Sequence, residues 1–133
     1  MRSVMQRLES RENRPLVLAV TALTSFDEAE FQAVYGSDIA AKADAFAVDA
    51  YQSGLDGVVC SAFESASIKA LTHENFVTLT PGIRPFGEDA QDQQRVATVA
   101  TAHEALVDFI VVGRPIYQAK DPAGVVAKIL AQL

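Results

Sequence analysis

Cysteine occurs only once in the 133 residues, at Cys60, so an internal disulfide is excluded and a reducing cytoplasm is favoured. No apolar run approaches the roughly 18 residues that a membrane span needs. The N-terminal residues also lack the apolar core of a signal peptide. From these absences we expect a cytoplasmic protein without a membrane partner.

Histidine is scarce as well. His73 and His103 have neither HxxxH spacing nor cysteine partners, so we expect surface histidines and no metal site. The sequence places no histidine or carboxylate close enough to Cys60 to make it a nucleophile, which predicts a small, buried, apolar residue.

Positive charge is limited, because the formal net charge is −6. This balance argues against nucleic acid as a partner, since phosphate backbones are bound by clustered Lys and Arg. The N-terminal arginines alternate with glutamates, which favours a solvated helix face over a nucleic-acid or membrane site. These residues are Arg2, Arg7, Glu9, Arg11, Glu12 and Arg14.

What the sequence does contain is an alternation of short apolar runs and helical patterns. Strands are expected at residues 16–23, 57–60, 76–79 and 108–112. Such alternation predicts an α/β fold with a parallel sheet and right-handed crossovers. Left alone, the first and fourth strands would be open edges, and one sheet face would meet water.

The helices are expected at residues 2–13, 27–35, 37–52, about 64–71, within 95–106, and after Asp121-Pro122. Ser25 or Asp27 would cap the helix that follows the first strand. Two buried stripes are predicted from helical spacing. One consists of Ile39, Ala43, Phe46 and Ala50, and the other of Val125, Val126, Ile129, Leu130 and Leu133.

Two apolar runs end in Gly, Arg and Pro, which is typical of strand ends that approach a phosphate. Gly82 and Gly113 can bring the backbone close to a ligand. Arg84 and Arg114 each offer a planar fork of donors, and Gln93 adds a neutral amide. Pro115 fits the first turn of a short helix.

The long loop after the third strand carries three acids, Glu88, Asp89 and Asp92. These would oppose a phosphate, so we expect them to face solvent or to pair with Arg84 or Arg95. Arg95 is the better candidate for a purely structural partner. The position of Phe86 in this loop stays open.

These motifs resemble the C-terminal half of bacterial orotidine 5′-phosphate decarboxylase. The family's Thr-Pro-Gly-Ile-Arg-Pro stands at residues 80–85, its Asp-Gln at 92–93 and its Gly-Arg-Pro at 113–115. Residues 20–25 resemble its fifth-strand ending, and residues 54–61 resemble its sixth strand. Several motifs in the same order are a far more specific signal than any one alone.

The resemblance implies a (β/α)8 barrel, of which residues 1–133 would form a single domain equivalent to strands 5–8. The family converts orotidine 5′-phosphate to UMP and CO2 without a cofactor and is typically dimeric. By the same resemblance, Thr24 would contact the pyrimidine. Arg84, Gln93, Gly113 and Arg114 would bind the phosphate.

The family's catalytic lysine and Asp-x-Lys-x-x-Asp motif have no counterpart in the chain, which contains no Asp-x-Lys. We therefore expect the chain alone to be inactive, with no catalytic residues of its own, and to associate with a second copy or a missing N-terminal half. Three alternatives remain: a non-catalytic phosphate-binding or interaction module, a related barrel acting on sugar phosphates, and a fold whose glycines and arginines are only structural.

Overall fold

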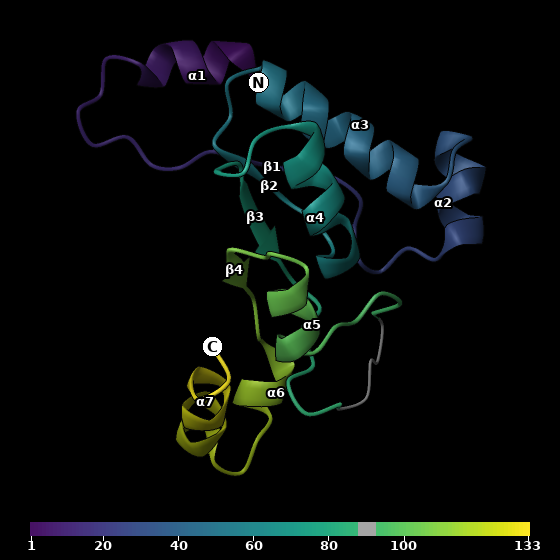
Figure 1. Ribbon diagram of the computed structural model, residues 1–133, viewed down its shortest axis with the longest axis vertical. Helices are drawn as coiled ribbons and strands as arrows, with labels where there is room; N and C mark the ends of the chain where they lie inside the picture. The colour runs from purple at the N-terminus through teal and green to yellow at the C-terminus, as the bar shows by residue number, and fades with distance from the viewer. Residues whose placement is uncertain (88–92) are drawn as a thin grey trace.

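The computed structural model describes residues 1–87 and 93–133, and its helices and strands alternate along the chain. Figure 1 shows an elongated molecule with α1 to α4 toward one end and α5 to α7 toward the other. The strands are β1 (Leu18–Val20), β2 (Gly57–Val59), β3 (Val77–Thr80) and β4 (Phe109–Ile110). The helices are α1 (Arg2–Leu8), α2 (Glu28–Tyr35), α3 (Ile39–Gln52), α4 (Ala62–Leu71), α5 (Val99–Glu104), α6 (Arg114–Tyr117) and α7 (Pro122–Leu130).

The four strands form one parallel sheet in the order β1-β2-β3-β4, which confirms the predicted half barrel. β1, β2 and β4 are shorter than the predicted strands, because the ends of those runs enter loops, whereas β3 keeps the predicted length and begins one residue later. The register aligns Val20 with Val59, Val59 with Leu79, and Leu79 with Phe109. Within this sheet β1 and β4 are the edges, as the sequence predicted.

Side chains cap the starts of α2 and α3. Asp27 caps α2 through a capping box with Glu30, so of the two predicted caps Asp27 is the one used. Gly36 then ends α2 with φ of 65°, a left-handed conformation that favours glycine. Asp38 caps α3 by accepting a hydrogen bond from the Ala41 amide.

The first core lies between the sheet and helices α3 and α4, which cover the same side of β2 and β3 (Figure 1). It includes Ala47 and Ala50 of α3, Val58 of β2 and Ile68 of α4. The prediction that Phe46 belongs to the buried face of α3 is wrong. Ala47 takes that place, because its small side chain allows the closely packed helix to approach the sheet.

Phe46 is half-buried beside α2 instead. Its ring lies edge-on to Tyr35, with ring centroids 6.0 Å apart, and the Lys42 ammonium lies 5.3 Å from its centroid. The large ring therefore helps to join α2 to α3, where there is more room than beneath the sheet.

The opposite face of the sheet has no covering layer among the described residues. Side chains alternate across a strand, so Val58 enters the core while Val59 and its register partners face the other way. At the two edges, Val20 is 56% exposed and Phe109 is 53% exposed. This arrangement matches the predicted exposure of the barrel-facing residues.

The predicted buried stripe of α7 is only partly buried. Ile129 is buried in a second hydrophobic cluster, with residues of α4 and α5, and Val125 is half-buried, whereas Val126, Leu130 and Leu133 are exposed. The prediction fails for these three because burial needs a second element on the outer side of β4. The three border an apolar groove with Ile110, Val112, Ile116 and Ile129.

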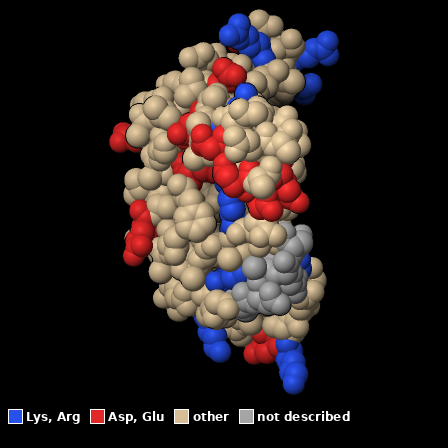
Figure 2. Space-filling model, turned by 90° about the vertical axis from the view of Figure 1, so that its right-hand side faces the viewer, with Lys and Arg blue, Asp and Glu red and all other residues tan. Residues whose placement is uncertain are grey.

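None of the helices in residues 1–87 and 93–133 is long and apolar enough to cross a bilayer. The N-terminal α1 buries only Met5. Figure 2 shows basic side chains at the end of the molecule where Figure 1 places α1, and acidic side chains gathered below them.

Candidate functional site

The segment that follows β3 supplies the first half of the candidate site. Gly82 has φ of 78°, and the next residue, Ile83, is fully buried. The Arg84 amide donates to the Ala97 carbonyl at 2.8 Å, and the Ala97 amide donates to the Gly82 carbonyl at 3.3 Å. The two ends of the long loop are thus joined at its base, where Arg84 is only 5% exposed.

The segment that follows β4 supplies the second half. The Val111 amide donates to the Thr80 carbonyl at 2.8 Å, so the carboxyl ends of β3 and β4 lie side by side. Gly113 is the N-cap of the single-turn helix α6, and Pro115 stands in its first turn, as predicted. Arg84 and Arg114 therefore extend from neighbouring strand ends, the edge at which barrel enzymes bind their ligands.

A cavity of about 230 Å³ opens between these two segments. The Arg84 side chain is buried, and Arg114 is half-buried. Among the lining residues that the structure describes, two are basic and none is acidic, so the cavity is suited to an anion. The lining residues are Pro81, Gly82, Arg84, Gln93, Val111, Gly113, Arg114 and Tyr117.

Four of the five residues predicted to bind substrate line this one cavity: Arg84, Gln93, Gly113 and Arg114. The fifth, Thr24, adjoins it. The Thr24 hydroxyl donates to the side-chain oxygen of Gln93, and Thr24 is itself 7% exposed. A Cβ at Gly82 would lie 3.4 Å from that oxygen and 3.7 Å from the Thr24 hydroxyl, so glycine allows the three residues to pack together. Their roles toward a ligand stay predictions.

The third arginine of this region, Arg95, has a different environment. It forms an ion pair with Glu64 of α4 and donates to the carbonyls of Ala22 and Leu23. Burial raises the pKa of Glu64, and the nearby Arg95 charge opposes that rise. Arg95 thus has a structural partner in Glu64, a residue that the sequence analysis did not name. The expected acids Glu88, Asp89 and Asp92 lie outside the described residues.

The remaining candidates from the sequence have no place in the site. Cys60 is buried at 1% exposure, and burial raises the pKa of its thiol to about 12, so it remains uncharged and unreactive. His73 and His103 are exposed, as predicted. No cluster of metal-ligating side chains occurs in the described part of the chain.

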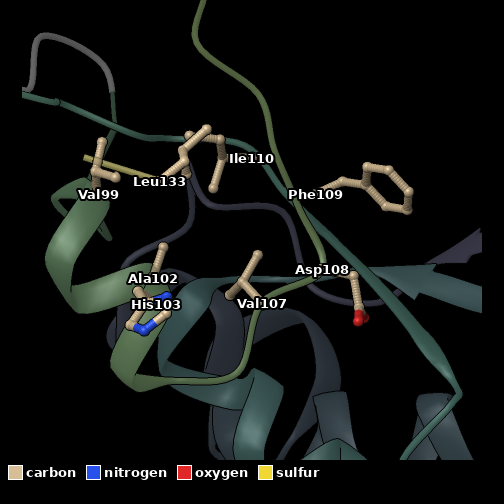
Figure 3. A pocket seen from close by; sticks show the side chains of 8 residues that line it. All are labelled: Val99, Ala102, His103, Val107, Asp108, Phe109, Ile110 and Leu133. Atoms are coloured by element: carbon tan, nitrogen blue, oxygen red, sulfur yellow. The ribbon is translucent and has the colours of Figure 1, made fainter. Parts of the chain in front are cut away.

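A second cavity, of about 240 Å³, lies toward the opposite end of β4. Figure 3 shows the side chains of Val99, Val107 and Ile110 gathered around it, while Phe109 points away from them. Its lining is mostly apolar, with His103 and Asp108 as its ionisable side chains. Barrel enzymes bind substrate at the carboxyl ends of their strands, so this cavity is not the candidate site.

The sequence analysis missed one residue that lines the cavity and one that lies beside it. Tyr117 lines the cavity from α6, and nothing in its local pattern distinguishes it from a surface tyrosine. Glu64 pairs with Arg95 and also forms a capping box with Ser61. The Ser-x-x-Glu spacing at residues 61–64 was a readable signal for that cap.

Comparison with known proteins places these motifs in context. The profile of the orotidine 5′-phosphate decarboxylase / HUMPS family matches residues 1–129. Over its whole length the chain is 68% identical to the orotidine 5′-phosphate decarboxylase of Sulfurimonas denitrificans, and the matched segment covers 59% of that protein. The chain is also 62% identical to the orotidine 5′-phosphate decarboxylase of Nautilia profundicola, and the match covers 58% of that protein.

The fold agrees with a solved structure. The crystal structure of orotidine 5′-phosphate decarboxylase from Lactobacillus acidophilus superimposes with a TM-score of 0.73 and 33% identity, over 92% of this chain and 51% of that one. The chain therefore spans between half and three fifths of the length of the relatives it matches. On the match over 129 of its residues, the chain belongs to the orotidine 5′-phosphate decarboxylase / HUMPS family.

Proposed function

We propose that the chain is the substrate-binding half of an orotidine 5′-phosphate decarboxylase, an enzyme that converts orotidine 5′-phosphate to UMP and CO2 without a cofactor. In this proposal residues 1–133 form one domain. The observation that supports it best is that one cavity is lined by Arg84, Gln93, Gly113 and Arg114. Thr24 is hydrogen-bonded to Gln93 beside this cavity.

The two arginines would bind the phosphate. Their guanidinium groups present planar forks of donors, and hydrogen bonds between two charged groups are about twice as strong as neutral ones. Gln93 would add its amide nitrogen, since its oxygen accepts from Thr24. Gly113 would let the backbone approach the phosphate. Thr24, farther along the same chain of contacts, would face the pyrimidine.

The size of the cavity favours a half site. Sites for small molecules usually enclose about 300–1,000 Å³. The cavity of about 230 Å³ is smaller than this range, as expected of a site that other elements complete. The rest of the site would come from the elements that cover the open sheet face, either an N-terminal half barrel or a second copy of the chain.

We also propose that the chain alone does not decarboxylate its substrate. Binding of the phosphate, which is remote from the reacting carbon, lowers the barrier to decarboxylation only when acid–base groups are also placed at that carbon. Lys42, Lys69 and Lys128 lie on α3, α4 and α7, and Lys120 lies in the turn before α7, so none stands at a strand end. A non-catalytic phosphate-binding module that associates with another subunit is the second candidate, favoured by the two open edges β1 and β4.

Calorimetric titration of the chain with UMP, uridine and ribose 5-phosphate tests the proposal. UMP should bind more tightly than either of the others, because it alone offers both the base and the phosphate. Arg114→Ala should weaken UMP binding by about 2 kcal/mol, or roughly thirtyfold, because it removes a charged hydrogen-bond donor. The matched control is Lys128→Ala on α7, which removes the same charge away from the cavity.

Equal affinity for UMP and ribose 5-phosphate would contradict the pyrimidine assignment. Unchanged UMP affinity in Arg114→Ala, or equal weakening in Lys128→Ala, would contradict the phosphate assignment. Release of CO2 from orotidine 5′-phosphate by the chain alone would contradict the proposed division of the enzyme into a binding half and a catalytic half.

A further inference from the structure

The ion pair between Glu64 and Arg95 lies next to the candidate site without lining it. Glu64 is 4% exposed, and its two carboxylate oxygens have different partners. One accepts from the Ser61 amide at 3.0 Å, which fixes the carboxylate to the start of α4. The other accepts from the Arg95 guanidinium. A buried carboxylate held from two sides has a single position, and it imposes that position on Arg95.

Arg95 connects this carboxylate to the end of β1. Its second guanidinium nitrogen donates to the Ala22 carbonyl at 3.1 Å and to the Leu23 carbonyl at 3.2 Å. The amides of Gln94 and Arg95 both donate to the Thr24 carbonyl, at 3.1 and 3.3 Å. Three successive carbonyls, 22 to 24, are thus held by residues 94 and 95.

Two residues of the candidate site lie inside this network. Thr24 follows the carbonyls that Arg95 holds, and Gln93 immediately precedes the two amides that hold Thr24. The Thr24 hydroxyl then donates to Gln93, which joins the two side chains. The side chains proposed to meet the pyrimidine and the phosphate are therefore fixed to each other and to α4.

We propose that Glu64 and Arg95 are positioning residues, which hold Thr24 and Gln93 in the geometry that a nucleotide monophosphate requires. The proposal rests on the proposed function for its ligand but not for its contacts. Neither side chain touches the ligand. Their contribution is that the Thr24–Gln93 pair is formed before binding, so that little ordering remains to be done when the nucleotide arrives.

The structure supplies a matched control on the same helix. Lys69, near the end of α4, forms an ion pair with Asp108 at 2.8 Å, and Asp108 also accepts from the Thr78 amide. Asp108→Asn therefore removes a negative charge from an ion pair of α4, as Glu64→Gln does. Asp108 precedes β4 and lies toward the end of the sheet opposite the candidate site.

The experiment compares the chain with Glu64→Gln, Arg95→Lys and Asp108→Asn. Urea unfolding reports stability, calorimetry reports the affinity for UMP, and NMR reports the side-chain amide of Gln93, assigned by its loss in Gln93→Glu. We expect Glu64→Gln to shift the Gln93 amide resonances in the ligand-free protein and to weaken UMP binding by about ten- to a hundredfold. Asp108→Asn should lower stability while leaving both readouts unchanged.

Arg95→Lys keeps the positive charge beside Glu64 but lacks the guanidinium fork that reaches two carbonyls and a carboxylate together. It should therefore shift the Gln93 resonances as Glu64→Gln does, although the ion pair with Glu64 is kept. If either variant folds and leaves the Gln93 resonances and the UMP affinity unchanged, the proposal is wrong. It is also wrong if Asp108→Asn produces equal changes. Absence of UMP binding by the unaltered chain would refute the proposed function, whereas the ligand-free Gln93 resonances would still decide the positioning role.

Discussion

Gly57 occupies a position in β2 where the chain leaves no room for a side chain. It is paired with Leu18 on one side and Val77 on the other. A Cβ at Gly57 would lie 2.6 Å from the Val77 Cβ and 2.8 Å from its carbonyl carbon, and nearer still to the carbonyl oxygen. Two of these three atoms are backbone of the neighbouring strand, so no rotamer change can relieve the overlap.

Gly57→Ala should therefore separate β2 from β3 at this point. Overpacking of this kind costs about 1–3 kcal/mol. A cost of about 2 kcal/mol, divided by a urea slope of about 1.5 kcal/mol/M, lowers the unfolding midpoint by roughly 1.3 M. Equilibrium unfolding in urea, followed by far-ultraviolet circular dichroism, measures this midpoint directly.

The matched control is Gly113→Ala, the same chemical change at the end of β4. There a Cβ would meet only the Tyr117 ring, at 3.7 Å, which is ordinary contact. Its free energy of unfolding should change by less than about 0.5 kcal/mol. If Gly57→Ala is as stable as Gly113→Ala, the close approach of β2 and β3 described above is wrong.

Three further predictions concern titration and the loop glycine. Burial raises the pKa of Cys60 from 9.0 to about 12. The stability that the uncharged thiol contributes is therefore complete below pH 9 and is lost as the pH rises to 12, a loss of up to about 4 kcal/mol in the free energy of unfolding. Cys60→Ala should remove this alkaline loss, which urea midpoints at several pH values would show. The hydrogen bond from Arg14 lowers the pKa of Asp56, so Asp56→Asn should destabilise the chain at pH 7 and lose that effect as the pH falls through the lowered pKa, as urea midpoints at several pH values would show. Gly82→Ala should lower the free energy of unfolding by about 1–2 kcal/mol, because Gly82 has a left-handed backbone conformation. It should also weaken UMP binding, because the new Cβ would lie 3.2 Å from the Arg95 carbonyl oxygen. Unchanged UMP affinity in calorimetry would contradict the described packing of the site.

The glycines and arginines that line the cavity were predictable because backbone chemistry reveals strand ends. An apolar run that stops at Gly-x-Arg-Pro or Gly-Arg-Pro combines a permissive backbone with an anion-binding side chain, and at Gly113 a helix start follows at once. Parallel strands then bring their carboxyl ends to one edge, so Arg84 and Arg114 had to be neighbours once β3 and β4 paired.

Other features depended on partners far away in the sequence. The choice of Ala47 over Phe46 on α3 follows from how closely the helix approaches the sheet, which helical periodicity does not report. The exposure of Leu130 and Leu133 depends on which element covers the outer side of β4. The Glu64–Arg95 pair joins residues 31 positions apart, and no local pattern links them.

The most direct test of the phosphate site is to map where UMP binds by ¹H–¹⁵N NMR on the isotopically labelled chain. The account predicts that titration shifts the resonances of Gly82, Gln93 and Gly113, which line the cavity at the carboxyl ends of β3 and β4, and of Thr24, which is hydrogen-bonded to Gln93. Shifts confined instead to residues around the other cavity, such as Val99 and Ile110, would contradict it.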